Sequence, residues 1–309
     1  MITIEHLSRR YGDSLAVDDV SFTIPAGEVV GLLGHNGAGK TTIMKMLTGF
    51  LEPTSGSIHI DALDIATDTA AIQRRLGYLP ENCPAWPEMT VIEFLEYQAV
   101  LHDIPAARRA AAVATAIRRT ELRDKAAQSI QTLSRGYRQR VGVAQAILHG
   151  PDIIILDEPT NGLDPTQILH MRALIRELSQ SATVIVSTHI LQEVQAVCQR
   201  VLILLAGRKV IDARLDELQS ETRLLVTLDR EPSAAVPLLQ SIEGVASVEF
   251  LEDTGGRYRY ALHAAEAVAP AVSAAVYRAG FALYGLSREQ RTLETVFAEV
   301  NELGRRDAA

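Results

Sequence analysis

The stretch GHNGAGKT, residues 34–41, constrains the fold more than any other part of the sequence. It follows the apolar run VVGLL and precedes the helical pattern TIMKML, so it lies in a strand-to-helix turn. Glycines in the spacing G-x-x-x-x-G-K-T let backbone N–H groups approach phosphate oxygens, because glycine has no Cβ to block them. Lys40 then supplies a cation for the outer phosphates, and the Thr41 hydroxyl can bind Mg²⁺. An ordinary glycine-rich turn is the alternative, but the flanking strand and helix favour a nucleotide site made of Gly34, His35, Asn36, Gly37, Ala38, Gly39, Lys40, Thr41 and Thr42.

Four dense apolar runs predict a parallel β-sheet with helices on both faces. Each run ends in a Gly, Pro or polar cluster, and helical patterns lie between them. In such α/β folds the loops at the carboxyl ends of the strands form the ligand site, so these polar clusters are expected to converge. The runs are EVVGLLG from Glu28, RLGYLP from Arg75, DIIILDEP from Asp152 and ATVIVSTH from Ala182.

Two carboxylates and a histidine follow these runs. Asp157 and Glu158 end the third run, where a purely structural strand would seldom place two adjacent charges. Beside a magnesium nucleotide, Asp157 can hold the metal shell, and Glu158 can polarise a water molecule for attack on the γ-phosphate. A helix cap in the following loop is the alternative for these carboxylates. His189 ends the fourth run, where a capping or core histidine is the usual case and a γ-phosphate contact is the functional one.

Composition limits the classes of partner. The formal net charge of -8 argues against a broad nucleic-acid surface, which needs a basic face to displace counterions. The two cysteines, Cys83 and Cys198, have no metal-type spacing. The longest clean apolar runs, such as VLILLAG from Val201, are strand-sized and shorter than the roughly 20 residues of a membrane helix. Any membrane role is therefore expected to depend on a partner.

The pattern changes along the chain predict two domains. Apolar residues alternate in period two near Ile2, Val20 and Ile58, which predicts short, half-buried strands. Helical patterns over residues 86–150 predict a helical insert, in which Thr90 has the spacing of a capping box. After residue 220 the order β-α-β-β-α-β predicts a small ferredoxin-like α+β domain. We therefore expect one domain at residues 1–220 and a second at residues 221–309.

The stretch LSRGYRQR, residues 133–140, has three possible interpretations. Its arginines could form a nucleic-acid patch, it could be an ordinary capped helix end, or it could be half of a phosphate site. Ser134 lies where an N-cap belongs, and Gly136 lies in the first helical turn, where free N–H groups favour an anion. Taken alone, the stretch is more often a capped helix than a ligand site.

The ordered motifs resemble those of the ATP-binding subunits of ABC transporters, from Met1 to about Asp212. GHNGAGKT resembles Walker A, IIILDE resembles Walker B, NGLD from Asn161 resembles the D-loop with Asp164, and His189 resembles the switch histidine. LSRGYRQR resembles the signature motif, although Arg135 and Tyr137 replace the commoner Gly and Gln. The resemblance implies the ABC cassette form of the P-loop NTPase fold, with a mainly parallel sheet, an antiparallel β subdomain and a helical insert. It also implies that Tyr11 stacks on adenine.

One departure from the family concerns the metal. Where the family usually has Gln after GYLP, this chain has Glu81, which can offer an oxygen to Mg²⁺ but adds a negative charge beside Asp157 and Glu158. By the resemblance, Thr41, Glu81 and Asp157 are the expected magnesium ligands. The GYLPEN and LSRGYRQR variants, with the C-terminal TLETVFAEV, resemble the branch that serves type-2 permeases of gliding-motility, drug-export and nitrous-oxide-reductase maturation systems.

The resemblance implies an ATPase that energises a transmembrane permease from the cytoplasmic face of the cell membrane. Two subunits, expected to be identical, would close over two ATP molecules with Mg²⁺. Each ATP would lie between one subunit's phosphate loop and Ser134 and Gly136 of the other. Export is favoured over import because the branch contains many exporters, and no nucleic-acid partner is expected. A soluble ABC ATPase that acts on nucleic acid or the ribosome is the alternative, since it would share these motifs.

Overall fold

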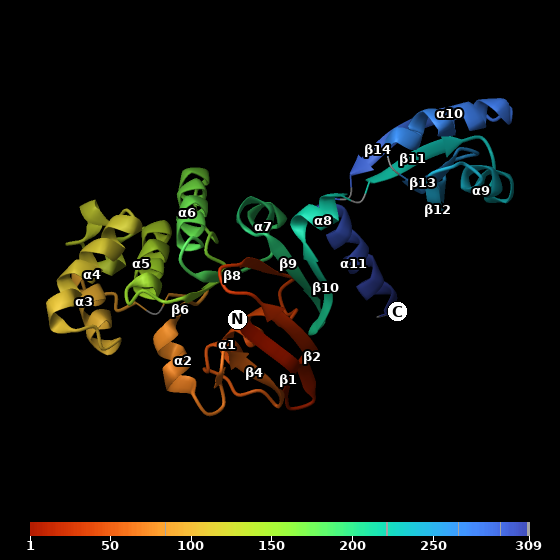
Figure 1. Cartoon of the computed structure of the whole chain (residues 1–309). Helices are drawn as coiled ribbons and strands as arrows, with labels where there is room; N and C mark the ends of the chain where they lie inside the picture. The colour runs from red at the N-terminus through yellow and green to blue at the C-terminus, as the bar shows by residue number, and fades with distance from the viewer. Residues whose placement is uncertain (84, 221, 265, 291, 308–309) are drawn as a thin grey trace. The chain divides into compact units, whose positions relative to one another are not determined.

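The computed structural model describes residues 1–83, 85–220, 222–264, 266–290 and 292–307 (Figure 1). The chain forms two compact units. The first contains Met1–Arg214 together with the residues from Val300 onward, and the second is Leu215–Glu299. The two units are described separately below, and the expected division into domains at residues 220 and 221 stays a prediction.

A six-stranded sheet of order β10-β9-β3-β8-β7-β6 forms the centre of the first unit. The predicted parallel arrangement is confirmed, because β3 pairs in parallel with β8 and β9, and β7 pairs in parallel with β6 and β8. The hairpin strand β10 is antiparallel to β9. Strands β3, β7 and β8 are buried along their whole length, as their unbroken apolar runs predict. The strands are β3 (Val29–Leu33), β6 (Leu76–Leu79), β7 (Ile153–Asp157), β8 (Thr183–Thr188), β9 (Arg200–Leu205) and β10 (Arg208–Arg214).

A second, antiparallel sheet has the order β2-β1-β4-β5. Its alternating residues Ile2 and Ile4 are buried, and they pair with Ile24 and Phe22 across the hairpin. These side chains share one hydrophobic core with apolar residues of the central sheet and of helix α1. Helix α1, which follows the phosphate loop, therefore packs in one core with both sheets. The elements are β1 (Ile2–Tyr11), β2 (Ser14–Ile24), β4 (Ser55–Ile60), β5 (Leu63–Asp64) and α1 (Lys40–Leu47).

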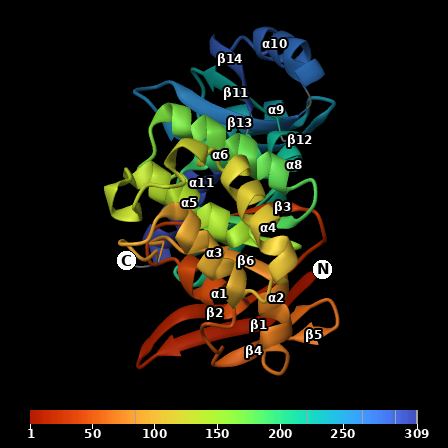
Figure 2. The ribbon, with the colours of Figure 1, turned by 90° about the vertical axis from the view of Figure 1, so that its left-hand side faces the viewer.

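The predicted helical insert contains three longer helices that pack on one another, shown in yellow and yellow-green in Figure 2. The capping box at Thr90 is present: its hydroxyl accepts from the Glu93 N–H, and the Glu93 carboxylate accepts from the Thr90 N–H. The helices are α3 (Val91–Leu101), α4 (Ala106–Arg119) and α5 (Arg135–Ile147), with short 3₁₀ turns at Arg123–Lys125 and Ile130–Thr132. The remaining helices of this unit are α2 (Thr69–Arg75), α6 (Pro165–Leu178) and α7 (Leu191–Val197).

Two stacked histidines join the end of α3 to the segment after α5. The rings of His102 and His149 lie parallel, with their centroids 4.0 Å apart. Within the described residues, neither buried ring nitrogen of His149 makes a hydrogen bond of normal geometry. Burial, reinforced by the charge of His102 and opposed by the Leu76 backbone, lowers the pKa of His149 to about 4. The fold therefore holds this ring neutral.

We expect His149→Phe to flatten the acid dependence of stability. Because the folded pKa lies below the ordinary value of about 6.5, the unfolded chain binds the extra proton between about pH 6.5 and pH 4, and stability falls as pH falls through that window. The loss from about pH 7 to pH 5 should shrink by about 2 kcal/mol in the variant. Denaturant unfolding at both pH values measures it, with the partly exposed His59→Phe as the control. An unchanged pH dependence in His149→Phe would contradict the assignment.

The second unit contains a four-stranded antiparallel sheet of order β12-β13-β11-β14. The predicted order of strands and helices is confirmed, and the sheet order is that of a ferredoxin-like fold. Buried Leu224, Val226 and Tyr260 of the sheet share a core with Leu239 of α9 and Val276 of α10. The elements are α8 (Leu215–Ser220), β11 (Thr222–Leu228), α9 (Pro232–Gln240), β12 (Val245–Asp253), β13 (Tyr258–Ala264), a 3₁₀ turn (Glu266–Val268), α10 (Ala269–Arg278), β14 (Leu283–Gln290) and the part of α11 (Leu293–Asp307) that precedes Val300.

None of the helices in the described part of the chain combines the length and the apolar character that a membrane-spanning helix needs.

Candidate functional site

A cavity of about 340 Å³ opens at the N-terminal end of α1. The carboxyl ends of β3, β7 and β8 lead into it, so the central sheet brings together segments that are far apart in the sequence. The predicted convergence of the polar clusters is therefore present. The lining residues are Ala16, His35, Asn36, Gly37, Gly39, Lys40, Thr41, Thr42, Glu81, Asp157, Glu158, Asn161 and His189.

The phosphate loop has the backbone geometry that its glycines allow. Gly39, the N-cap of α1, has a φ of 102°. A Cβ added to Gly39 would lie 2.7 Å from the carbonyl oxygen of Ala16, so a side chain is excluded both by the dihedral and by the space. The first N–H groups of α1 have no intrahelical partner, and with the helix dipole they create a positive potential at the cavity. This end of α1 is suited to an anion.

Lys40 is a buried cation in the first turn of α1. Its Nζ donates to the carbonyl oxygen of Gly34 at 2.7 Å and to that of His35 at 3.3 Å. Burial lowers the pKa of Lys40, while the charges of Glu158, Asp157 and Glu81 raise it. The ammonium group thus has hydrogen-bond acceptors on the loop and carboxylates nearby, and its positive charge faces the space that phosphates would fill.

Thr41 and Asp157 meet across the cavity floor. The Thr41 hydroxyl donates to Asp157 Oδ2 at 3.1 Å, and Asp157 is 1% exposed. Burial raises the pKa of Asp157, hydrogen bonds from the Ser187 and Thr41 side chains oppose this, and the charges of Glu158 and Glu81 act in the same direction as burial. A cation beside this carboxylate would remove the cost of burying its charge.

The donor set fits Mg²⁺. One carboxylate and one hydroxyl, with Glu81 on the same cavity wall, supply only oxygen ligands. The described residues contain no cluster of three or more His, Cys, Asp or Glu side chains that could hold a metal alone. Mg²⁺ commonly completes such a partial set with water and substrate phosphates.

Glu158 is held in an unusual backbone conformation. Its φ is 49°, in the left-handed region that non-glycine residues seldom adopt. Its N–H donates to the Ser187 carbonyl at 2.9 Å, and its own carbonyl accepts from the Asn161 N–H at 3.1 Å. The Gln139 amide also donates to that carbonyl, at 3.4 Å. These contacts fix the backbone of Glu158 at the cavity, which Glu158 lines together with Asp157.

His189 contacts the Glu158 carboxylate. Its Nδ1 lies 3.0 Å from both carboxylate oxygens. An ionised carboxylate only accepts hydrogen bonds, so in this pair Nδ1 carries the hydrogen. The Glu158 side chain is 9% exposed and that of His189 is 47% exposed. The pair therefore joins a shielded carboxylate to a ring at the cavity mouth.

Six predicted site residues lie outside the cavity lining: Tyr11, Gly34, Ala38, Ser134, Gly136 and Asp164. Tyr11 ends β1, is 47% exposed, and lies under the Arg9 guanidinium at 4.8 Å. Asp164 is the N-cap of α6, where its carboxylate accepts from the Gln167 N–H at 2.8 Å. A helix cap was the alternative role for Asp157 and Glu158. Asp164 caps the following helix instead. The ligand role of Asp164 stays a prediction, as does that of Tyr11.

Ser134 and Gly136 lie at the start of α5. Ser134 is the predicted N-cap, and its hydroxyl accepts from the Tyr137 N–H at 3.5 Å. Gly136 is buried, and a Cβ added to it would clash with the side-chain oxygen of Gln167 in α6. The helix end is capped within the chain, and whether it also binds phosphate across a dimer stays a prediction.

Three residues near the site were not predicted to belong to it. Ala16 and Asn161 line the cavity, and Gln139 is 6% exposed and holds the Glu158 carbonyl. Helical spacing puts Gln139 on the same face of α5 as Gly136 and Val143, and both of these are buried. A polar residue on a buried helix face is the signal that could have identified Gln139 from the sequence.

Comparison with known proteins identifies the family. The family described as ABC transporter matches residues 17–161. The chain is 38% identical to the ABC transporter ATP-binding protein NatA of Bacillus subtilis over 229 residues, which are 72% of this chain and 93% of NatA. It is 34% identical to the Nod factor export ATP-binding protein I of Burkholderia orbicola, over 68% of this chain and 70% of that protein.

Solved structures agree with this assignment. The structure of an ATP-binding subunit of an ABC transporter has 30% identity and a TM-score of 0.65, and the match covers 71% of this chain and 92% of that one. The dimeric structure of the bacterial ABC transporter cassette MJ0796 has 25% identity and the same TM-score, over 70% of this chain and 99% of that one. The chain therefore belongs to the ABC transporter family, as one of its ATP-binding ATPase subunits.

Proposed function

We propose that two copies of this chain bind two Mg²⁺-ATP molecules and energise a transmembrane permease of the type-2 exporter branch, on the cytoplasmic face of the membrane. The observation that carries the proposal is the convergence of Lys40, the Thr41–Asp157 pair and the Glu158–His189 pair on one cavity at the N-terminus of α1. Relatives of this chain include an ATP-binding protein of Nod factor export, which favours export. A nucleic-acid ATPase is not favoured, because the relatives described above are transporter subunits.

The phosphate loop and Lys40 bind and orient the triphosphate. N–H groups of residues 37–42 and the Lys40 ammonium donate to phosphate oxygens, and this leaves the γ-phosphate near Glu158. Thr41, Asp157 and Glu81 would hold Mg²⁺, which neutralises charge on the β- and γ-phosphates when it is bound. Of these ligands Glu81 is the least like the family, since it carries a charge where an amide is usual.

Glu158 is the general base in this proposal. Its carboxylate accepts a proton from the attacking water, because its backbone conformation holds it at the cavity while Asp157 remains with Thr41. His189 positions that carboxylate through Nδ1 and is available to contact the γ-phosphate. Ser134 and Gly136 would contact the γ-phosphate held by the second copy, and Asp164 would lie in the loop between the two sites. Tyr11 would stack on the adenine.

An apolar surface on the helical insert is the proposed docking site for the permease. Tyr97, Val100 and Leu101 of α3 are exposed, and Trp86 contacts Tyr97 edge-on with ring centroids 6.1 Å apart. Exposed apolar clusters of this kind mark interaction sites. Next to them, a cavity of about 670 Å³ begins at His102.

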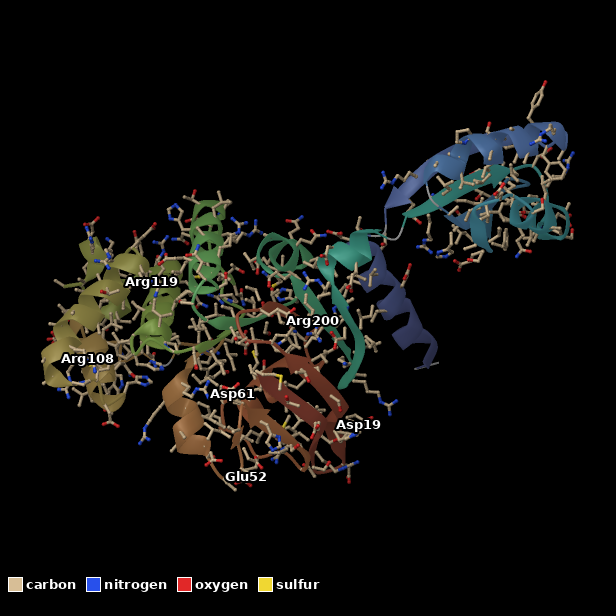
Figure 3. All side chains as sticks on the ribbon, viewed as in Figure 1. Asp19, Glu52, Asp61, Arg108, Arg119 and Arg200 are labelled. Carbon is tan, nitrogen blue, oxygen red and sulfur yellow. The ribbon has the colours of Figure 1, made fainter. Side chains whose placement is uncertain are left out.

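Arginines surround that second cavity. Arg108 and Arg119 of α4, both labelled in Figure 3, and Arg74 of α2 contribute to its lining, and Arg119 also pairs with Glu177 at 2.8 Å. An apolar floor with a cationic rim suits an amphipathic segment that carries carboxylates. We therefore propose that a cytoplasmic segment of the permease with acidic and apolar residues docks here.

We expect Leu101→Glu to abolish co-purification with the permease from detergent-solubilised membranes. The added charge would face the apolar docking segment, where burying it without a partner is costly. ATP hydrolysis by the free protein should be unchanged, because Leu101 is 58% exposed and lies outside the ATP cavity. The control is Val210→Glu, an exposed apolar residue on β10. Retention of the permease by Leu101→Glu would contradict this docking site.

Affinity purification of the full chain from membranes tests the function as a whole. The expected result is a polytopic membrane protein in the eluate, together with Mg²⁺-dependent ATP hydrolysis. Recovery without a membrane protein, combined with ATP hydrolysis stimulated by duplex DNA at physiological salt, would overturn the proposal in favour of a nucleic-acid ATPase.

A further inference from the structure

The start of α5 touches the segment after β7 at three points. Gln139 donates to the Glu158 carbonyl, Gly136 lies against Gln167 of α6, and Arg135 lies against Gly162. The segment from Glu158 to Asp164, here called the 158–164 segment, carries the proposed base at one end and the cap of α6 at the other. The signature stretch and this segment are therefore in contact within one chain.

Arg135 is exposed, and the end of its side chain lies against Gly162. A Cβ built on Gly162 would lie 2.7 Å from Arg135 Cδ, 2.7 Å from Nε and 2.9 Å from Cζ. Gly162 has a φ of 76°, in the left-handed region that favours glycine. Arg135 makes no hydrogen bond or ion pair with the residues that the structure describes.

One side of this contact lies next to the ATP cavity of the same chain, and the other side lies next to residues proposed to contact the ATP of a second copy. Asn161, next to Gly162, lines the cavity of the same chain. Ser134 and Gly136, on either side of Arg135, are the residues proposed to contact the ATP of a second copy. A displacement of the 158–164 segment by nucleotide in its own cavity would therefore reach the signature stretch through Arg135.

We propose that Arg135 is a positioning residue that couples each subunit's own ATP site to the signature stretch it presents to the second subunit. The inference rests on the proposed ATP-bound dimer. It assigns a role to the residue that replaces the family's commoner glycine: without a side chain at position 135, the contact with Gly162 could not form. The proposed coupling element is one packing contact between the start of α5 and the 158–164 segment. A substitution at either residue can break it.

A double-mutant cycle on the full chain tests the contact. The four proteins are wild type, Arg135→Ala, Gly162→Ala and the double variant, and ATP hydrolysis is measured against ATP concentration. Gly162→Ala should lower kcat about fivefold in the wild-type background, because the flexible end of Arg135 must move away from the added Cβ and the contact is lost, but less than about twofold beside Arg135→Ala. The backbone strain of alanine at a φ of 76° is present in both backgrounds and cancels. Equal losses in the two backgrounds would overturn the proposal.

The Hill coefficient for ATP distinguishes a coupling role of Arg135 from a role in stability alone. Arg135→Ala should lower the Hill coefficient for ATP towards one and reduce kcat about fivefold, with the ATP KM and the thermal midpoint close to wild type. Arg135→Lys should behave the same way, since lysine keeps the charge but loses the planar group. The control is Arg138→Ala, an exposed arginine of the same helix, which should match wild type. A Hill coefficient in Arg135→Ala equal to that of Arg138→Ala would overturn the proposal.

The proposed function is checked in the same assay. If wild type hydrolyses ATP and Glu158→Gln does not, the ATPase assignment stands whatever the cycle shows. Absence of hydrolysis in wild type would count against the proposed function instead.

Discussion

Glu158→Gln is expected to abolish ATP turnover while ATP still binds, and to accumulate an ATP-bound dimer. The amide has the shape of the carboxylate but cannot accept the proton of the attacking water. Loss of the general base should lower kcat by at least about a hundredfold. Phosphate release measures turnover, and size-exclusion chromatography with and without ATP measures the dimer.

The geometry around Glu158 makes this variant informative. The backbone is fixed by the bonds to the Ser187 carbonyl and from the Asn161 N–H and the Gln139 amide, and none of these involves the carboxylate. Glutamine can keep the contact with His189 Nδ1 through its amide oxygen. The substitution therefore changes the chemistry of the side chain without releasing the segment.

A carboxylate on the surface provides the control for Glu158→Gln. Glu177→Gln changes an acid to an amide at an exposed ion pair with Arg119, and it should leave turnover unchanged. Normal hydrolysis by Glu158→Gln would exclude Glu158 as the base. Failure of this variant to form an ATP-bound dimer, with ATP still bound, would contradict the proposed closure of two subunits.

The sequence predicted the parts of the site that depend on strand ends. The phosphate loop, Asp157, Glu158 and His189 each follow a continuous apolar run, and parallel strands bring their carboxyl ends to one edge of a sheet. Once the runs are recognised as one sheet, the convergence of these residues follows from topology. The β-α-β-β-α-β order of the second unit was predicted from hydrophobic periodicity, because each strand and helix there shows the period of its own type.

Contacts between elements could not be predicted in this way. The hydrogen bond from Gln139 to the Glu158 carbonyl and the contact of Arg135 with Gly162 depend on how α5 packs beside the segment after β7. The hydrophobic periodicity of the sequence carries no information about that packing. The left-handed conformation of Glu158 is equally hidden, since glutamate has no preference for it and tertiary contacts impose it. The stacking of His102 on His149 likewise depends on the separate ends of two helices.

Lys40→Ala is expected to lower ATP affinity at least about a hundredfold, which corresponds to roughly 3 kcal/mol of binding free energy. The ammonium group is the cation of the phosphate loop, and it is already held at the cavity by the carbonyls of Gly34 and His35. Because this group is pre-positioned and buried, ATP gains a charge-assisted contact at little entropic cost. Alanine leaves the loop N–H groups in place but removes that contact.

Thermal unfolding distinguishes the loss of the ATP contact in Lys40→Ala from the loss of the fold. Burial lowers the pKa of Lys40, so the charge is costly for the fold and its removal should leave the thermal midpoint without ATP close to wild type. ATP should raise the midpoint of wild type and not that of Lys40→Ala, because only a ligand that binds the folded state stabilises it. The control is Lys45→Ala, an exposed lysine in the last turn of the same helix, which should retain the full ATP-induced shift. An ATP-induced shift of wild-type size in Lys40→Ala would show that the loop binds phosphate without its lysine.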